Sequence, residues 1–149
     1  MSDINELYQE VIIDHGRRPR NYRQLDNPTA VKQGHNPLCG DSLTLYLQVE
    51  DGIIKDISFE GQGCAISMAS TSMMTQALLG KSMVEAQQLF ADFHNMIIEP
   101  QDADIEHLGK LSVLSGVTQY PMRVKCATLA WHTFKAIMDN DDVTVSTEK

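Results

Sequence analysis

The sequence predicts an α+β fold in which an N-terminal helix and several C-terminal helices pack on one face of a small three-stranded antiparallel sheet. Residues 42–50 alternate between apolar and polar side chains, which is typical of a strand with one solvated face. Asp51-Gly52 is a strong two-residue hairpin signal, and residues 53–60 return as the partner strand. Beyond residue 64 the apolar side chains follow helical spacing, so most of the helices come after the sheet.

The segment before the hairpin predicts one helix and one further strand. Apolar residues between positions 3 and 15 recur at helical spacing, and Asp3 and Glu6 match a capping box. A cluster of arginines at 17–20 follows, which we interpret as charge at a helix C-terminus, with docking to an acidic partner as the alternative. Residues 30–35 are expected to add the third strand at the edge of the sheet.

Two helices are predicted directly after the hairpin. The first covers residues 64–79 and ends at Gly80, a residue type favoured just beyond a helix. Ser82 and Glu85 form a capping box for the second helix, which stops before Pro100. The first helix is dense in Ala, Ser and Met, and the second carries one apolar stripe.

The remaining chain predicts a loop, a short helix and a long helix. Residues 101–106 form an acidic loop, and residues 107–114 are expected to be a short helix. Pro121 then opens the last long helix as a first-turn proline. The polar tail at 139–149 is expected to be disordered, and residues 1–149 form a single domain.

Composition excludes several classes of function. The formal net charge of −8 argues against a nucleic-acid partner or an anionic membrane surface. No apolar run approaches the length of a membrane span, and the acidic start of the chain shows no signal peptide. Three cysteines are an odd number without secretory features, which favours free or metal-bound thiols in a reducing compartment. We therefore expect a cytoplasmic protein that binds neither membranes nor nucleic acid.

Three cysteines and one aspartate are the candidate metal ligands: Cys39, Asp41, Cys64 and Cys126. Three thiolates and a carboxylate complete a tetrahedral set for Zn²⁺, or a shell for an iron–sulfur cluster. No two of the cysteines form a CxxC pair, so the fold itself must bring them together. The alternative is that each cysteine is simply a small buried apolar residue.

The neighbours of each cysteine favour its thiolate form. Cys39 is followed by Gly40 and stands two residues after Pro37, which predicts a loop just before the first long strand. Cys64 opens a helix, where the orphan backbone N–H groups favour negative charge. Cys126 lies early in the last helix beside Arg123 and Lys125, whose positive charges act in the same direction.

The histidines carry less signal. His35 could lie near the site, although a backbone hydrogen bond in its turn is the favoured interpretation. His132 is expected to point away from the cysteine of its own helix. The other three, His15, His94 and His107, are expected at helix ends or on the surface.

Three motifs occur in order along the chain: Asn-Pro-Leu-Cys-Gly-Asp at 36–41, Gly-Gln-Gly-Cys-Ala-Ile-Ser at 61–67 and Cys-Ala-Thr-Leu-Ala at 126–130. Together they resemble the U-type iron–sulfur cluster assembly proteins, the group that contains IscU, the NifU N-terminal domain and SufU. The resemblance extends from the N-terminal helix to the last helix. It implies an α+β fold of the SufE/NifU-like kind and a role in iron–sulfur cluster assembly.

Departures from the IscU pattern indicate the SufU branch of this group. Lys125 stands where IscU-type proteins carry a histidine before the third cysteine. Residues 119–123 replace the IscU motif that a dedicated Hsp70 chaperone recognises. The 62 positions from Cys64 to Cys126 exceed the IscU-type spacing. Similarity to SufU implies a tightly bound zinc and, as partner, a PLP-dependent cysteine desulfurase of the SufS type.

The leading functional hypothesis is a zinc-bound sulfur acceptor that works with this desulfurase rather than as a stand-alone enzyme. Cys39 is the predicted sulfur acceptor because its Pro/Gly loop can move, whereas Cys64 and Cys126 are expected to be anchored on helices. Arg123 is expected to orient Asp41 or the departing thiolate, and Lys125 to tune the local charge. A downstream scaffold or apo-protein would receive the sulfur.

Two alternatives stay open on sequence grounds. The same four ligands could form a scaffold on which a transient [2Fe–2S] cluster is built and passed on. The site could instead be a structural zinc module that only mediates protein contacts, although Asp is an unusual ligand in such sites.

Overall fold

The computed structural model describes residues 3–36, 40–98, 106–139 and 145–146 of the chain. Its elements follow one another in the order α1 (Asp3–Arg17), β1 (Ala30–Asn36), β2 (Asp41–Glu50), β3 (Ile53–Gln62), α2 (Ala65–Leu78), α3 (Met83–Ile98), the 3₁₀ segment η2 (Glu106–Gln119), α4 (Pro121–Met138) and β4 (Val145–Ser146). The predicted α+β class and the predicted order of strands and helices are confirmed.

The sheet is built around β2, which pairs antiparallel with β1 on one side and with β3 on the other. Asp51 and Gly52 both adopt positive φ angles, 54° and 76°, as a two-residue turn of the primed type requires, so the predicted hairpin is confirmed. Leu43, Leu45 and Leu47 of β2 face inward and are buried, while the residues between them face the opposite side. The alternation in the sequence therefore separates the residues of β2 that face the core from those that face the other side of the sheet.

The sheet gains a fourth strand that the sequence did not predict. The two-residue β4 pairs parallel with β1, through Gly34 with Val145 and His35 with Ser146. The expectation of a disordered tail is therefore wrong at these two residues, which form a strand. The rest of that tail beyond Asp139 lies outside the described residues, as does most of the predicted acidic loop at 101–106.

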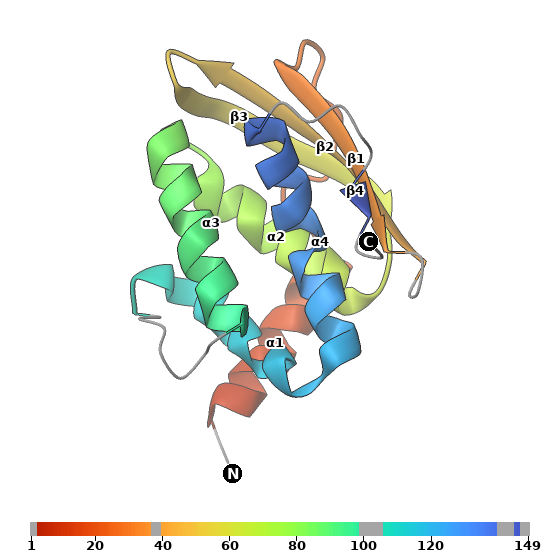
Figure 1. The fold of residues 1–149 in the computed structure, drawn as a ribbon. Coiled ribbons are helices and arrows are strands. Elements are labelled where there is room, and N and C mark those ends of the chain that lie inside the picture. The colour runs from red at the N-terminus through yellow and green to blue at the C-terminus, as the bar shows by residue number, and fades with distance from the viewer. Residues whose placement is uncertain (1–2, 37–39, 99–105, 140–144, 147–149) are drawn as a thin grey trace.

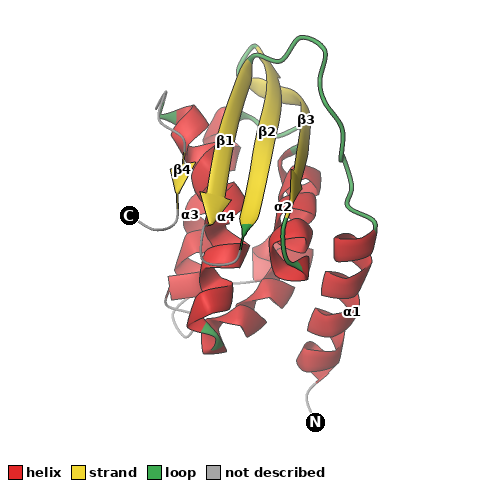
Figure 2. Ribbon diagram, turned by 90° about the vertical axis from the view of Figure 1, so that its right-hand side faces the viewer, coloured by secondary structure: helices red, strands yellow, loops and turns green. Residues whose placement is uncertain are grey.

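The helices gather on one face of the sheet (Figure 1), and the view turned by 90° shows the other face of the strands uncovered (Figure 2). Helices α2 and α4 contact the strands and each other, α1 packs on α2, and α3 packs on α4 and η2. The ring of Phe93 in α3 stacks on Trp131 in α4 with centroids 4.2 Å apart. No helix among the described residues is long and apolar enough to cross a membrane.

A polar bridge ties α2 to α4 inside the core. The hydroxyl of Ser70 donates to the carbonyl of Ala127 over 2.5 Å and accepts from the indole N–H of Trp131 over 3.2 Å. All three residues are buried, so the bridge satisfies polar groups that would otherwise be costly to bury. It fixes the relative position of the two helices that carry Cys64 and Cys126.

The sequence predicted the start of α3 correctly but predicted the segment before α4 only in part. The backbone N–H of Ser82 donates to Glu85, and the N–H of Glu85 donates to the Ser82 hydroxyl, so the predicted capping box is confirmed. The short helix expected at 107–114 is instead a longer 3₁₀ segment. Gly109 interrupts it with φ 57° and ψ −127°, a conformation that no continuous helix accommodates.

His15 lies in the last turn of α1, as expected for a helix-end residue, but it is not at the surface. Its side chain is fully buried between α1 and α2, where Nδ1 lies 2.7 Å from the Ser72 hydroxyl. Burial, reinforced by the positive charges of Lys110 and Arg20, lowers the pKa of His15 to about 4. The histidine is therefore a neutral core residue that joins the N-terminal helix to the rest of the protein.

Candidate metal centre

Three of the four predicted ligands meet in the structure. A carboxylate oxygen of Asp41 and the sulfur atoms of Cys64 and Cys126 all lie within 4.8 Å of one another. They come from the first residue of β2, the residue that caps α2, and the early turns of α4. The fourth predicted ligand, Cys39, lies outside the described residues. The site is thus a product of tertiary structure, as the absence of a CxxC pair predicted.

One carboxylate oxygen of Asp41 accepts a hydrogen bond, and the other is available to bind a cation. The side chain is only 1% exposed, and Oδ1 accepts a hydrogen bond from the backbone N–H of Cys64 over 2.8 Å. Oδ2 is buried and has no hydrogen-bond partner among the described residues. A buried carboxylate oxygen without a donor is costly in free energy, and a bound cation removes that cost. This orphan oxygen, beside two sulfurs, fits a metal ion.

Cys64 is fixed by its position at the start of α2. Its backbone is extended (φ −71°, ψ 166°), as expected for the residue that caps a helix. Its sulfur accepts from the backbone N–H of Ser67 at 3.4 Å. This contact holds the sulfur at the first turn of α2.

Cys126 lies on the opposite side of the site and is 1% exposed. The side-chain amide of Asn36 approaches it, with Nδ2 at 3.7 Å from the sulfur. Asn36 is also the residue opposite Asp41 in the pairing of β1 with β2. Asn36 is the first residue of the Asn-Pro-Leu-Cys-Gly-Asp motif, but the sequence indicated no separate role for it.

Gly63 is a second residue whose role the sequence did not indicate. A Cβ atom built on this glycine would lie 3.0 Å from the carboxylate carbon of Asp41 and closer still to Oδ1. Any side chain there would push the carboxylate off the Cys64 N–H. Gly63 therefore leaves room for Asp41 at the start of α2.

The two basic residues beside Cys126 differ in exposure. Arg123 is exposed, and Lys125 is half-buried. Because Oδ1 of Asp41 accepts from Cys64 and Oδ2 has no partner among the described residues, Arg123 does not hold Asp41 in this structure. The expected roles of Arg123, to orient Asp41 or the departing thiolate, stay predictions.

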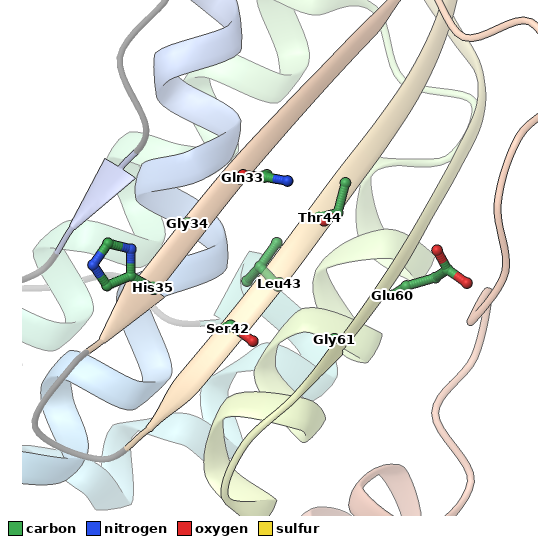
Figure 3. Close-up of a pocket in the computed structure, with 8 residues that line it drawn as sticks. All are labelled: Gln33, Gly34, His35, Ser42, Leu43, Thr44, Glu60 and Gly61. Carbon is green, nitrogen blue, oxygen red and sulfur yellow. The ribbon is translucent and has the colours of Figure 1, made fainter.

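The opposite face of the sheet carries a shallow groove of about 330 Å³ next to the metal-binding end of β1 and β2 (Figure 3). Gln33, His35, Ser42, Thr44 and Glu60 line it from three strands. His35 is exposed on this face, whereas its neighbour Asn36 is buried on the other. His35 is therefore separated from the metal centre by the sheet.

The two buried sulfurs and the carboxylate oxygen define what the centre can bind. Thiolates with a carboxylate suit Zn²⁺ and also suit iron held with sulfide, and they disfavour hard cations such as Mg²⁺. A fourth donor would complete a tetrahedral shell, and Cys39 is the residue that the sequence offers for it. The described part of the chain contains no other group of three or more potential ligands at this spacing.

The chain is similar to known proteins in both sequence and fold. The chain is 44% identical over 135 residues to an iron–sulfur cluster assembly scaffold protein IscU of Streptococcus pyogenes, covering 91% of this chain and 84% of the relative. It is 42% identical over 130 residues to the zinc-dependent sulfurtransferase SufU of Bacillus subtilis, covering 87% and 88%. Relatives with these two different names are thus almost equally similar to the chain.

A solved structure agrees with the fold described above. The crystal structure of FiSufU from Fervidobacterium islandicum AW-1, described as an iron–sulfur cluster assembly scaffold protein for the SUF system, superimposes with a TM-score of 0.81 at 37% identity, covering 88% of this chain and 96% of that one. The model of the NifU-like N terminal domain matches residues 7–127, which include all four predicted ligands. The chain therefore belongs to the family of NifU-like N-terminal domains, the family of the iron–sulfur cluster assembly proteins IscU and SufU.

Proposed function

We propose that this protein accepts sulfur from a PLP-dependent cysteine desulfurase of the SufS type and passes it on for iron–sulfur cluster assembly in the cytoplasm. The observation that carries the proposal is the orphan oxygen of Asp41 beside the sulfurs of Cys64 and Cys126. A carboxylate among thiolates is unusual in closed structural zinc sites and suits a site that exchanges a ligand. Lys125 before the third cysteine and the similarity to a zinc-dependent sulfurtransferase support the same assignment.

Cys39, Asp41, Cys64 and Cys126 would hold Zn²⁺, and the bound ion would keep the thiols deprotonated at neutral pH and protect them from oxidation. Cys39 lies outside the described residues, but it is two positions from Asp41 in the chain. Two peptide units span at most about 7 Å, which supports Cys39 as the fourth ligand in this proposal.

The transfer step is an exchange at sulfur. The Cys39 thiolate attacks the outer sulfur of the persulfide on the desulfurase cysteine. A new S–S bond forms on Cys39 while the S–S bond on the desulfurase breaks, and the desulfurase cysteine leaves as a thiolate. No electrons are gained or lost overall. The backbone N–H of Ser67 would hold the Cys64 sulfur and the Asn36 amide the Cys126 sulfur, while the exposed Arg123 would meet the departing charge.

Desulfurase turnover tests the proposal directly. Adding the zinc-loaded protein to a SufS-type desulfurase with cysteine should raise the rate of alanine formation, and Cys39→Ala should abolish this increase while some zinc remains bound. Mass spectrometry should find one added sulfur on the wild type and none on the variant. Persulfide on another cysteine, or full stimulation by Cys39→Ala, contradicts the assignment of the acceptor.

A transient [2Fe–2S] scaffold on the same ligands is the second candidate function. The similarity to a relative named as a cluster scaffold favours it, and two thiolates beside a carboxylate form a shell from which a cluster can leave. Metal analysis of protein purified without oxygen, followed by anaerobic reconstitution, separates the two functions. Stoichiometric zinc that resists exchange supports sulfur transfer, whereas a coloured cluster that moves to an apo-protein supports the scaffold.

A purely structural zinc module is the third reading of the same ligands. In that case Asp41→Ala would lower thermal stability and leave the stimulation of the desulfurase unchanged. Sulfur transfer predicts that the same variant loses stimulation.

A further inference from the structure

We propose that Asn36 is a positioning residue for the metal-bound sulfur of Cys126, to which its side-chain amide donates an N–H···S hydrogen bond. The proposal deepens the proposed function, since it concerns how the same site treats its individual thiolates. It begins from the 3.7 Å distance between Nδ2 of Asn36 and the Cys126 sulfur, a contact between residues 90 positions apart in the chain. That distance is within the range of hydrogen bonds to the larger sulfur atom.

Burial strengthens the hydrogen bond between Asn36 and Cys126. Asn36 is 0% exposed and Cys126 is 1% exposed, so water does not compete for either group. In such surroundings a hydrogen bond to a charged acceptor is stronger than one at the surface. The orientation of the amide follows from the same chemistry, because its oxygen would repel a thiolate whereas its N–H group attracts one.

The backbone places Asn36 where this contact is fixed. Asn36 ends β1 and pairs directly with Asp41, which begins β2. One side of this strand pair therefore reaches the sulfur on α4, through Asn36, and the other side reaches the start of α2, through Asp41. The short segment that carries Cys39 joins these two residues. Both ends of that segment are thus attached to the metal centre.

An N–H···S hydrogen bond draws electron density away from a thiolate. It makes the sulfur a weaker donor to the metal and a weaker nucleophile, as hydrogen bonds to cysteine sulfur do in metal sites that tune their potentials this way. Cys64 receives a comparable bond from the backbone of Ser67. Through Asn36, Cys126 becomes a ligand of reduced reactivity that stays in place, which leaves the acceptor role to Cys39.

Replacement by leucine keeps the branching of the side chain and removes the hydrogen bond. Asn36→Leu removes the donor and also removes Oδ1, which is buried without a partner among the described residues. The substitution should therefore leave the protein folded. Asn36→Asp, measured at a pH alkaline enough to ionise its buried carboxyl group, serves as a second variant, because an ionised carboxylate of the same shape cannot donate to sulfur.

The measurement uses purified protein loaded with Co²⁺ alone, with no desulfurase present. A more electron-rich sulfur transfers charge to cobalt at lower energy, so both variants should shift the sulfur-to-cobalt absorption to longer wavelength. Asn21→Asp is the matched control, since the Asn21 amide donates over 2.9 Å to Thr75, in the last turn of α2, far from the ligand that caps its start. Its spectrum should equal that of the wild type.

Two results overturn the proposal. One is an unchanged charge-transfer spectrum in a folded, cobalt-loaded Asn36→Leu, and the other is an equal shift in Asn21→Asp. If Asn36→Leu does not fold, the Asn36→Asp spectrum decides in the same way. Because the spectrum needs no sulfur transfer, a shift together with absent desulfurase stimulation would leave the role of Asn36 standing while the proposed function falls.

Discussion

Asp41 accepts a hydrogen bond from the backbone N–H of Cys64 over 2.8 Å, so the main chain of one ligand holds the carboxylate of another. Only one carboxylate oxygen is used in this way, and the second lies buried without a partner among the described residues. The two oxygens therefore have separate roles: Oδ1 joins β2 to the start of α2, and Oδ2 is free to bind a cation. This separation allows the two roles to be tested independently.

The substitution Asp41→Asn should weaken metal binding while preserving the fold. An asparagine keeps an oxygen for the Cys64 N–H but replaces the charged second oxygen with a neutral amide. Even outer-shell changes cost metal sites about 10- to 100-fold in affinity, so loss of a charged ligand should cost at least this much. Competition with a zinc chelator measures the change. Equal zinc affinity in Asp41→Asn and wild type would show that Oδ2 is not a ligand.

The substitution Gly63→Ala should also weaken metal binding, although residue 63 has no ligand atom. Its new Cβ would lie 3.0 Å from the Asp41 carboxylate carbon, so the carboxylate must move away from Cys64. Gly16→Ala is a suitable control, because its Cβ would meet Ala65 at an ordinary 3.4 Å within a helix. The control should bind zinc like the wild type and be more stable by about 0.5–1 kcal/mol. Undiminished zinc affinity in Gly63→Ala would contradict this account.

Features fixed by neighbouring residues in the chain were predictable from the sequence. The alternation in β2, the turn at Asp51-Gly52 and the capping box at Ser82 each depend on side chains a few positions apart. Their energetics are local, so local patterns reveal them. The candidate ligands were also predictable, because each stands in a distinctive short motif.

Features that depend on distant contacts were not predictable in this way. The burial of His15 depends on a partner 57 positions away, and the contact of Asn36 with Cys126 spans 90 positions. The steric role of Gly63 depends on where the β2 carboxylate lies in space. No periodicity or propensity encodes such contacts, since tertiary packing alone decides them. The parallel pairing of β4 with β1 belongs to the same class.

Stability should fall between pH 6.5 and pH 4 because of His15. Its pKa is about 4 in the folded protein and near 6.5 in the unfolded chain, so the unfolded state takes up a proton first as the pH falls. The contribution is complete above pH 6.5 and is lost progressively below it, by up to roughly 3 kcal/mol. Arg20 and Lys110 reinforce the shift, while Asp14 opposes it. Urea denaturation at pH 7 and at pH 5 measures the loss.

The variant His15→Gln should show a smaller decrease in stability between these two pH values than the wild type does. The exposed His35 provides the control, because His35→Gln should keep the wild-type pH dependence. Equal pH dependence in wild type and His15→Gln would mean that another group dominates acid destabilisation.

Removal of the metal should lower the melting temperature, because a bound ion connects three elements of the fold. The ligand atoms of Asp41, Cys64 and Cys126 come from β2, the start of α2 and α4, so a bound ion links the sheet to two helices. A ligand at a thousandfold excess over its dissociation constant stabilises the native state by about 4 kcal/mol. For a domain of this size that corresponds to roughly 10 °C. Calorimetry with and without a chelator should show this decrease for the wild type and a clearly smaller one for Asp41→Asn, because that variant binds the metal more weakly. A wild-type melting temperature that does not respond to the chelator would mean that these three residues meet for reasons of packing alone.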